Sequence, residues 1–220
     1  SVKDSRVKII VSWKKLGPYR GLNFLLDVAQ GEYIAIQDHD DVWNPQKLEK
    51  QIHYLEAHPS MIGCGTKTLM YYEADKKWFE YYLGDKNYYT IHPSLVFRNS
   101  SKRYPENITY MTDAYFQKKI LCDGKKLIHN IDQTLTLHLV KSAASNYSYK
   151  RFTYSRSTLH SIFGLHPWWY GLWVLFRETK RRFAYPVLKL LWRVKMIDWF
   201  ERVPFVLLGY KIIQVKKPRF

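Results

Sequence analysis

GEYIAIQDHDDVWNPQKLE, residues 31–49 of the chain, contains an apolar run followed directly by an acidic cluster. The run, Tyr33–Ile36, is typical of a strand buried in a sheet. The cluster that follows it contains the carboxylates of Asp38, Asp40 and Asp41. The sequence therefore predicts three acidic side chains at the carboxyl end of a central strand, which is the edge where ligands bind in open α/β sheets.

The segments on either side of this stretch predict alternating strands and helices. Asn44 is a good N-cap and Pro45 suits the first helical position, so a helix is expected to run to about His58. Upstream, a short strand, a helix and the strand of the motif would form a βαβ unit. The remaining predicted elements are a strand at Arg6–Ser12, a helix over Leu22–Ala29 that is ended by Gly31, strands at Met61–Tyr71 and Pro93–Phe97, a helix from Thr112 to Leu121 and a half-exposed strand at Leu127–Val140. The stretch Tyr72–Tyr89 has no clear assignment.

The acidic cluster suggests a cation site. Three carboxylates within four positions repel one another, so their proximity costs free energy unless a cation or a donor group compensates. Mg²⁺ and Mn²⁺ bind carboxylate oxygens, commonly one or two from protein with the rest from water and substrate phosphates. The alternative is a polar loop that caps the following helix, and the pattern alone leaves both interpretations open.

Residues 31–49 resemble the signature GEYIAFLDxDDxWxPxKLE of family 2 glycosyltransferases, which have the GT-A nucleotide-sugar-binding fold. Asn23 lies where that family often has an Asn at the start of the preceding helix. The segment His92–Arg98, HPSLVFR, resembles its later acceptor-side segment. The resemblance spans roughly residues 6–146 and implies an α/β fold with a GT-A-like (Rossmann-like) mixed sheet flanked by helices.

The resemblance implies transfer of a sugar from a nucleoside-diphosphate donor to an acceptor hydroxyl, with inversion at the anomeric carbon. Such a displacement needs a cation to neutralise charge on the leaving diphosphate and a base to take the acceptor proton. Asp38, Asp40, Asp41 and Arg98 are the expected donor-binding residues. Asp40, with Asp41 or Asp38, is expected to hold Mn²⁺ or Mg²⁺, and Asp40 with Asp41 is the preferred pair.

The expected base comes from a second segment. The family places an acidic residue, often within Glu-Asp, at the start of a helix downstream of the acceptor segment. Met111–Tyr115 resembles that region with Thr112 in place of the Glu, which leaves Asp113 as the predicted base. The structural alternative is a favourable first-turn carboxylate, and Glu106 is the reserve candidate.

Other polar residues near these motifs have simpler interpretations. Arg98 could pair with phosphate through its planar fork, or it could be an ordinary residue that follows a strand. Lys15 and Arg20 lie in the loop before the first helix, where they could approach the diphosphate, but they are expected to be solvated. His39 and His138 have no ligand spacing to a partner and are expected to be ordinary polar residues.

The chain lacks the two strands with which this family normally begins, one that reads like VSVIIPTYN and one that ends in DDGS. The segment Arg6–Ser12 resembles the third strand of that pattern. We therefore expect the sequence to be a fragment of a longer enzyme. A non-catalytic protein that keeps the fold without the donor pocket is the alternative.

Composition divides the chain near residue 146. Lys and Arg outnumber Asp and Glu by 20 to 16 over residues 1–147 and by 15 to 3 over residues 148–220, which also contain five of the eight tryptophans. Basic residues interleaved with Trp and Leu are typical of helices that lie in a membrane interface, so we predict that 147–220 is helical and contacts an anionic membrane surface. Packing of this tail on the core is the second interpretation, and nucleic-acid binding ranks last.

The resulting prediction is a GT-A-like domain at 1–146 followed by a basic, aromatic helical region at 147–220. Its partners would be a nucleoside-diphosphate sugar and a glycan or lipid-linked acceptor, in glycan or cell-surface polysaccharide assembly. The expected location is cytoplasmic, at the cytoplasmic face of a membrane. Cys64 and Cys122 are too few for a disulfide scaffold or a four-ligand zinc site and are expected to be buried thiols.

Overall fold

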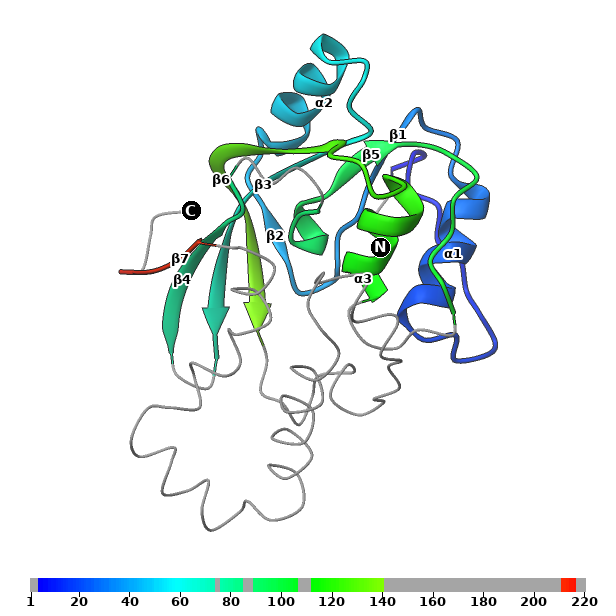
Figure 1. Cartoon of the computed structure of the whole chain (residues 1–220). Helices are drawn as coiled ribbons and strands as arrows, with labels where there is room; N and C mark the ends of the chain where they lie inside the picture. The colour runs from blue at the N-terminus through cyan, green and yellow to red at the C-terminus, as the bar shows by residue number, and fades with distance from the viewer. Residues whose placement is uncertain (1–3, 74–75, 85–88, 107–111, 141–210, 217–220) are drawn as a thin grey trace, which may run out of the picture.

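The structure, a computed structural model, describes residues 4–73, 76–84, 89–106, 112–140 and 211–216. Within these residues a mixed sheet is flanked by helices, which confirms the predicted α/β class (Figure 1). In chain order the elements are α1 (Pro18–Val28), β1 (Tyr33–Ala35), β2 (Val42–Trp43), α2 (Lys47–Ala57), β3 (Gly63–Tyr72), β4 (Lys77–Tyr82), the 3₁₀ turn η1 (His92–Ser94), β5 (Val96–Arg98), α3 (Thr112–Tyr115), the π-helical segment η2 (Phe116–Leu121), β6 (Ile128–Val140) and β7 (Lys211–Val215).

The sheet is built around β3. Along one path the strands follow the order β1-β5-β3-β4-β7, and every pair on this path is antiparallel. On its other side β3 pairs in parallel with β6, which in turn pairs antiparallel with the short β2. The combination of parallel and antiparallel pairs makes the sheet mixed, as predicted.

Helices cover both faces of the sheet. Neighbouring residues of a strand point to opposite faces, so each strand contacts helices on both sides. Val96 of β5 packs with Leu55 of α2 and with Cys64 on one face. The next residue, Phe97, packs on the other face with Leu26 of α1 and with several side chains of the α3–η2 segment and its surroundings, including Phe116, Leu121 and Ile128. The two cysteines are buried free thiols, as expected, and burial raises the pKa of each to about 12.

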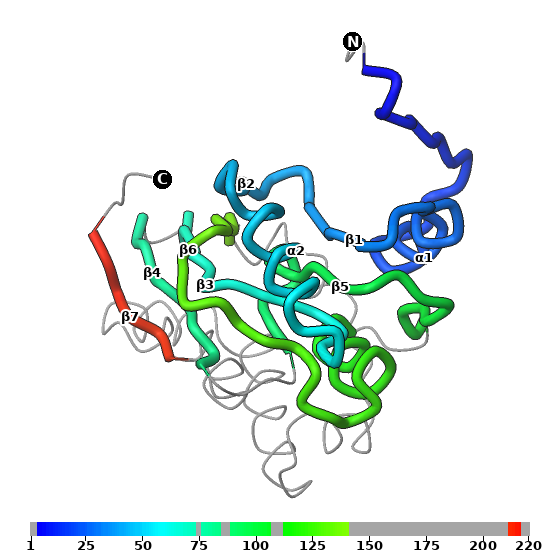
Figure 2. The backbone as a smooth tube through the Cα atoms, turned by 90° about the horizontal axis from the view of Figure 1, so that it is seen from above, coloured from blue at the N-terminus to red at the C-terminus, as the bar shows by residue number. Residues whose placement is uncertain are grey.

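The predicted strand at Arg6–Ser12 is wrong. These residues form no strand, and the side chains of Ile9 and Val11 are 81% and 69% exposed. Figure 2 shows this segment lying apart from the sheet before it enters α1. A strand requires a neighbouring strand to pair its backbone groups, and none of the described strands lies beside this segment.

Two further segments differ from the sequence-based expectation. The unassigned stretch after Tyr72 contains β4, which forms a hairpin with β3. In the second segment, Lys211–Val215 lies within the region 147–220 that was expected to be helical, but it forms β7, which adds to the sheet edge beside β4 (Figure 2). The β-branched residues Ile212, Ile213 and Val215 explain the preference for a strand.

The predicted strand at Leu127–Val140 is confirmed as β6, and of its polar face Thr134 and His138 are half-buried. Thr136 is fully buried and its hydroxyl lies 3.3 Å from that of Thr66. Most of the predicted helical tail, residues 147–210 and 217–220, lies outside the described residues. Among the residues that the structure describes, no helix has the length and apolar character needed to cross a membrane.

Candidate active site

The acidic cluster forms a tight turn directly after β1. The backbone N–H of Asp41 donates to the carbonyl of Asp38 at 3.2 Å, and the side-chain amide of Gln37 donates to the carbonyl of Asp41 at 3.2 Å. Asp38 is exposed, Asp40 is half-buried and Asp41 is buried. The turn therefore holds three carboxylates at increasing depth beside one sheet edge.

Asp41 contacts a histidine from the distant strand β6. Val42 of β2 pairs with Leu137 of β6, so Asp41 is brought to the residue after Leu137, which is His138. The Nδ1 atom of His138 lies 2.6 Å from Oδ1 of Asp41 across 97 residues of sequence. Burial alone would lower the pKa of His138, but the hydrogen bond with Asp41 and the charges of the three carboxylates raise it above its ordinary value. His138 is thus the partner of Asp41, which sequence spacing did not reveal.

The carboxylates of the turn are chemically suited to a hard divalent cation. Oδ2 of Asp41 is buried and has no hydrogen-bond partner among the described residues, so this oxygen keeps its capacity to accept a cation or a donor. The described part of the chain contains no group of three or more His, Cys, Asp or Glu side chains arranged to hold a metal ion. A donor set of one or two carboxylates completed by water and substrate phosphates is the arrangement that Mg²⁺ commonly uses.

Asp113 and Asp38 of the acidic turn both influence the pKa values of one pair of tyrosines. Asp113 lies in the first turn of α3, where it is half-buried. Burial raises the pKa of both Tyr19 and Tyr104, and the negative charges of Asp113 and Asp38 raise each of them further. Thr112 and the backbone of Asp113 act in the opposite direction and lower the pKa of Tyr19 in part. The predicted base and Asp38 of the acidic turn therefore both lie near the same two phenols.

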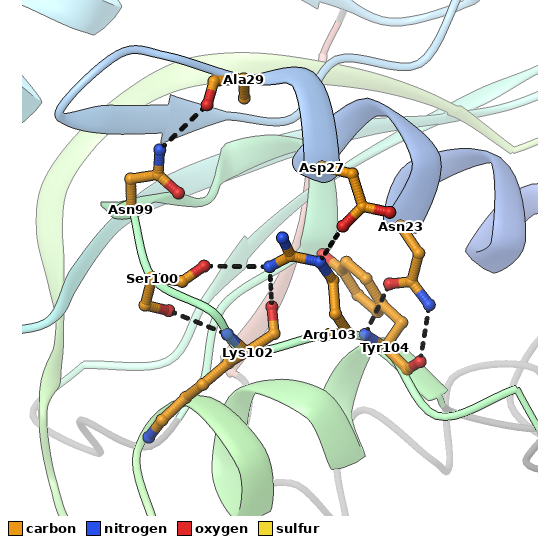
Figure 3. A network of polar contacts seen from close by, with 8 residues as sticks. All are labelled: Asn23, Asp27, Ala29, Asn99, Ser100, Lys102, Arg103 and Tyr104. Carbon is orange, nitrogen blue, oxygen red and sulfur yellow. Dashed lines mark hydrogen bonds and ion pairs between the residues drawn. The ribbon is translucent and has the colours of Figure 1, made fainter.

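The two tyrosines are themselves firmly held. Their rings stack with centroids 5.6 Å apart, and the Tyr104 hydroxyl lies 2.9 Å from Nε2 of His92. Asn23 of α1 accepts from the Tyr104 backbone N–H at 2.7 Å and donates to its carbonyl at 2.9 Å (Figure 3). Beside this clamp, Arg103 donates to Asp27 of α1 at 2.7 Å, which fixes the same loop to the same helix (Figure 3).

The reserve base, Glu106, has a different environment. Its Oε2 accepts a hydrogen bond from Nε of Arg20 at 2.8 Å in an exposed ion pair. Arg20, expected to be solvated, thus has an acidic partner. Glu106 therefore forms a surface ion pair next to Tyr19, whereas Asp113 lies in the first turn of α3.

Arg98 does not lie with the acidic turn. In the sheet register Arg98 pairs with Tyr33, at the end of β1 opposite to the turn. Its guanidinium donates to the carbonyls of Leu55 at 2.6 Å and Met61 at 3.1 Å and to the hydroxyl of Tyr33 at 3.1 Å. These contacts tie the C-terminal end of α2 to the sheet, so the structure does not bring Arg98 together with the other predicted donor-binding residues.

Comparison with known proteins places the chain in a family. The sequence profile described as Glycosyl transferase family 2 matches residues 1–122. An uncharacterized glycosyltransferase of Methanocaldococcus jannaschii is 27% identical over 140 residues, which cover 56% of this chain and 48% of that protein. The chain therefore spans about half the length of this relative.

Two further similarities involve named proteins. The Escherichia coli protein UDP-Glc:alpha-D-GlcNAc-diphosphoundecaprenol beta-1,3-glucosyltransferase WfaP is 40% identical over 55 residues, 25% of this chain and 22% of that protein. The crystal structure of Staphylococcus aureus TarS 1-349 in complex with UDP-GlcNAc matches with a TM-score of 0.48 and 17% identity, covering 67% of this chain and 45% of that chain. Since the family profile alone covers more than half of the residues, the resemblance noted in residues 31–49 is confirmed, and the chain belongs to glycosyl transferase family 2.

Proposed function

We propose that this chain carries the donor and base residues of a metal-dependent, inverting glycosyltransferase that acts in glycan or cell-surface polysaccharide assembly. The observation that carries the proposal is that Asp38 and Asp113, 75 positions apart in the sequence, both lie near Tyr19 and Tyr104. The Tyr104 ring stacks at 3.9 Å on the ring of Phe116, three residues after Asp113. Inverting transfer needs one acidic region at the donor and a separate carboxylate at the acceptor.

In the proposed reaction, Asp113 takes the proton of the acceptor hydroxyl. The hydroxyl oxygen then forms a bond with the anomeric carbon of the donor sugar from the face opposite the diphosphate. The bond between that carbon and the phosphate oxygen breaks, and its electron pair leaves with the nucleoside diphosphate. The attack from the opposite face inverts the configuration at the anomeric carbon.

Asp40 and Asp41 would hold Mn²⁺ or Mg²⁺, with Asp38 beside them in contact with the donor. When bound, the ion supplies neutralising charge at the diphosphate of the donor. His138 holds Oδ1 of Asp41, so only Oδ2 of that side chain is left for a ligand. Arg98 is not part of the proposed site, since its guanidinium is bound at the other end of β1.

The acceptor side of the proposal rests on relatives. The E. coli relative is named for transfer of glucose from UDP-Glc to a GlcNAc on diphosphoundecaprenol, which supports a nucleotide-sugar donor and a lipid-linked acceptor here. A lipid-linked acceptor would agree with the predicted contact of residues 147–220 with an anionic membrane surface at the cytoplasmic face. This contact stays a prediction, because residues 147–210 lie outside the described part of the chain.

Calorimetry with UDP-, GDP- and dTDP-sugars in the presence of Mn²⁺ tests the donor site. The wild-type protein should bind one class of donor, and Asp40→Ala should remove the Mn²⁺-dependent part of this binding, whereas the exposed control Glu56→Ala should leave it unchanged. Unchanged Mn²⁺-dependent binding and turnover in Asp40→Ala would refute the metal role.

Donor hydrolysis, in which water replaces the acceptor hydroxyl, tests the base. Asp113→Asn should abolish hydrolysis while sparing donor binding. The matched control is Asp123→Asn, at an exposed position with φ 51°, where Asn is well tolerated. Hydrolysis that survives in Asp113→Asn would mean that the base is elsewhere, and wild-type binding without any turnover would favour a non-catalytic sugar-binding protein.

A further inference from the structure

Gln117 makes an unusual pair of contacts for a helical side chain. Its Oε1 accepts a hydrogen bond from the Thr90 backbone N–H at 2.7 Å, and its Nε2 donates to the Thr90 carbonyl at 3.1 Å. The side chain is fully buried. One amide thus satisfies both backbone groups of one residue, which a neighbouring strand would otherwise do, and loss of either bond would leave a buried polar group unpaired.

This clamp acts on the segment that carries the proposed base. Asp113 in α3 and Gln117 in η2 lie one turn apart in one continuous helical segment, Thr112–Leu121. Fixing Gln117 to the backbone of Thr90 therefore fixes the rotation and the depth of the turn that presents Asp113. The change from α- to π-helical geometry between the two residues is a local distortion of the kind often found at functional sites.

The Thr90–Ser94 segment is also held from the side of the acidic turn. Trp43, two residues after Asp41, donates from Nε1 to the carbonyl of Pro93 at 3.0 Å. Gln51 of α2 donates to the carbonyl of Ser94 at 2.9 Å, and the hydroxyls of Thr90 and Ser94 lie 2.6 Å apart. Thr90–Ser94 is therefore a rigid link between the strand that follows the acidic turn and the helix that carries Asp113.

We propose that Gln117 is a positioning residue for sugar transfer, which sets the place of Asp113 relative to the Asp38–Asp41 turn through the backbone of Thr90. This inference rests on the proposed function. Gln117 touches neither donor nor acceptor in this role, so its loss should impair the chemical step and leave donor binding intact. Displacement of a reacting group by about 1 Å can cost about 100-fold in rate.

The decisive variant is Gln117→Met, which keeps the side-chain length and removes both hydrogen bonds. The probe is whichever of UDP-glucose, GDP-mannose and dTDP-glucose binds the wild-type protein with Mn²⁺. We expect kcat for hydrolysis of this donor to fall by about 10- to 100-fold, the calorimetric Kd to change less than about twofold, and amide exchange at Thr90 to accelerate. The exposed control Gln30→Met should match the wild type in all three measurements.

Gln117→Glu provides a second variant that does not depend on how well the methionine protein folds. A protonated carboxyl can accept from the Thr90 N–H and donate to its carbonyl, whereas a carboxylate can only accept. The ratio of the variant's kcat to that of the wild type should therefore rise as the pH is lowered from 8 to 6. A ratio that stays flat would overturn the positioning role.

The outcomes separate this inference from the function on which it rests. Faster exchange at Thr90 in Gln117→Met with unchanged kcat, while Asp113→Asn abolishes hydrolysis, would show that the clamp is structural only. Hydrolysis that survives Asp113→Asn would instead overturn the base assignment. Absence of donor binding by the wild-type protein would overturn the proposed function, and the positioning role with it.

Discussion

The two ends of β1 use charged side chains in opposite ways. At the Tyr33 end, the guanidinium of Arg98 donates to two backbone carbonyls and one hydroxyl and lies 5.3 Å from the centroid of the Tyr33 ring. At the other end, the turn that follows Ile36 leaves Asp38 exposed and leaves Oδ2 of Asp41 buried without a hydrogen-bond partner among the described residues.

This difference separates a charge that stabilises the fold from one that is available to a ligand. The donors of Arg98 are matched to acceptors whose isolation would cost about 1–3 kcal/mol each. A buried carboxylate oxygen without a hydrogen-bond partner also costs free energy, and no contact within the described structure offsets this cost. Such an oxygen is expected in a group that completes its contacts when a ligand binds. Sequence motifs place both residues in the donor site, whereas the pairing of their polar atoms distinguishes them.

The largest effect on activity is expected from a change at Asp41. Asp41→Asn keeps the shape of the side chain and removes the charge, so we expect kcat/KM for donor hydrolysis with Mn²⁺ to fall by about 100-fold, which corresponds to about 2.7 kcal/mol. The free energy of unfolding in urea should change less than this, because the gain from removing a buried charge is offset by the weaker hydrogen bond with His138. Lost stability with unchanged kcat/KM would show that Asp41 serves the fold alone.

Arg98→Met should show the reverse pattern. Removal of the guanidinium leaves the carbonyls of Leu55 and Met61 without this donor, and we expect the free energy of unfolding to fall by about 2 kcal/mol. The ion pair with Glu32, 3.5 Å away at the surface, should contribute little to this loss. The donor Kd should not change, and weakened donor binding with intact stability would return Arg98 to the donor site.

A smaller effect is expected at His138, which links the acidic turn to β6. His138→Phe removes the hydrogen bond that orients the Asp41 carboxylate through Oδ1, so the Mn²⁺-dependent donor affinity should fall by about tenfold. His138→Gln retains a neutral donor and should recover most of the affinity. Equal losses in the two variants would argue that packing, not the hydrogen bond, is what His138 supplies.

Lys47 shows that a buried polar atom without a hydrogen-bond partner does not by itself mark a ligand site. Its fully buried Nζ has no hydrogen-bond partner among the described residues and lies 4.0 Å from the centroid of the Trp43 ring. Burial lowers the pKa of Lys47 from its ordinary 10.5 to about 7. Between these two values the unfolded chain binds more protons than the folded protein, so stability should rise with pH.

The slope is at most about 1.4 kcal/mol per pH unit, and attraction between the charged amine and the Trp43 ring makes it shallower. Urea denaturation between pH 7 and 9 should show this rise in the wild type and in Lys50→Met, and a flatter profile in Lys47→Met. Identical profiles in all three proteins would mean that Lys47 stays charged in the folded state.

Local structure around the acidic turn could be predicted because each element carries its own signal. Tyr33–Ile36 is an apolar run and becomes β1, while Leu48, Ile52 and Leu55 form a helical stripe and lie in α2. The observed start of α2 differs only slightly from the predicted start. Asn44 accepts a hydrogen bond from the Gln46 N–H at 3.0 Å in a turn that precedes the first helical residue, Lys47.

Contacts between distant segments could not be predicted, because no local pattern specifies them. His138 was identified only as a polar residue on a strand, and its role depends on the register of β2 against β6. The same limit applies to Arg6–Ser12, where strand propensity finds no partner strand in the described residues, and to Lys211–Val215, whose pairing with β4 overrides a helical expectation. Propensity indicates what a segment can form, and tertiary pairing decides the outcome.

The pairing of β6 with both β3 and β2 also affects how the protein is made. Contacts between residues so far apart in sequence carry a high loop-closure cost and form slowly. The acidic turn emerges from the ribosome about 100 residues before its partner His138. During synthesis, the carboxylates of this turn therefore stay without that partner until translation has passed the end of β6, and a nascent chain that stops earlier cannot complete the site.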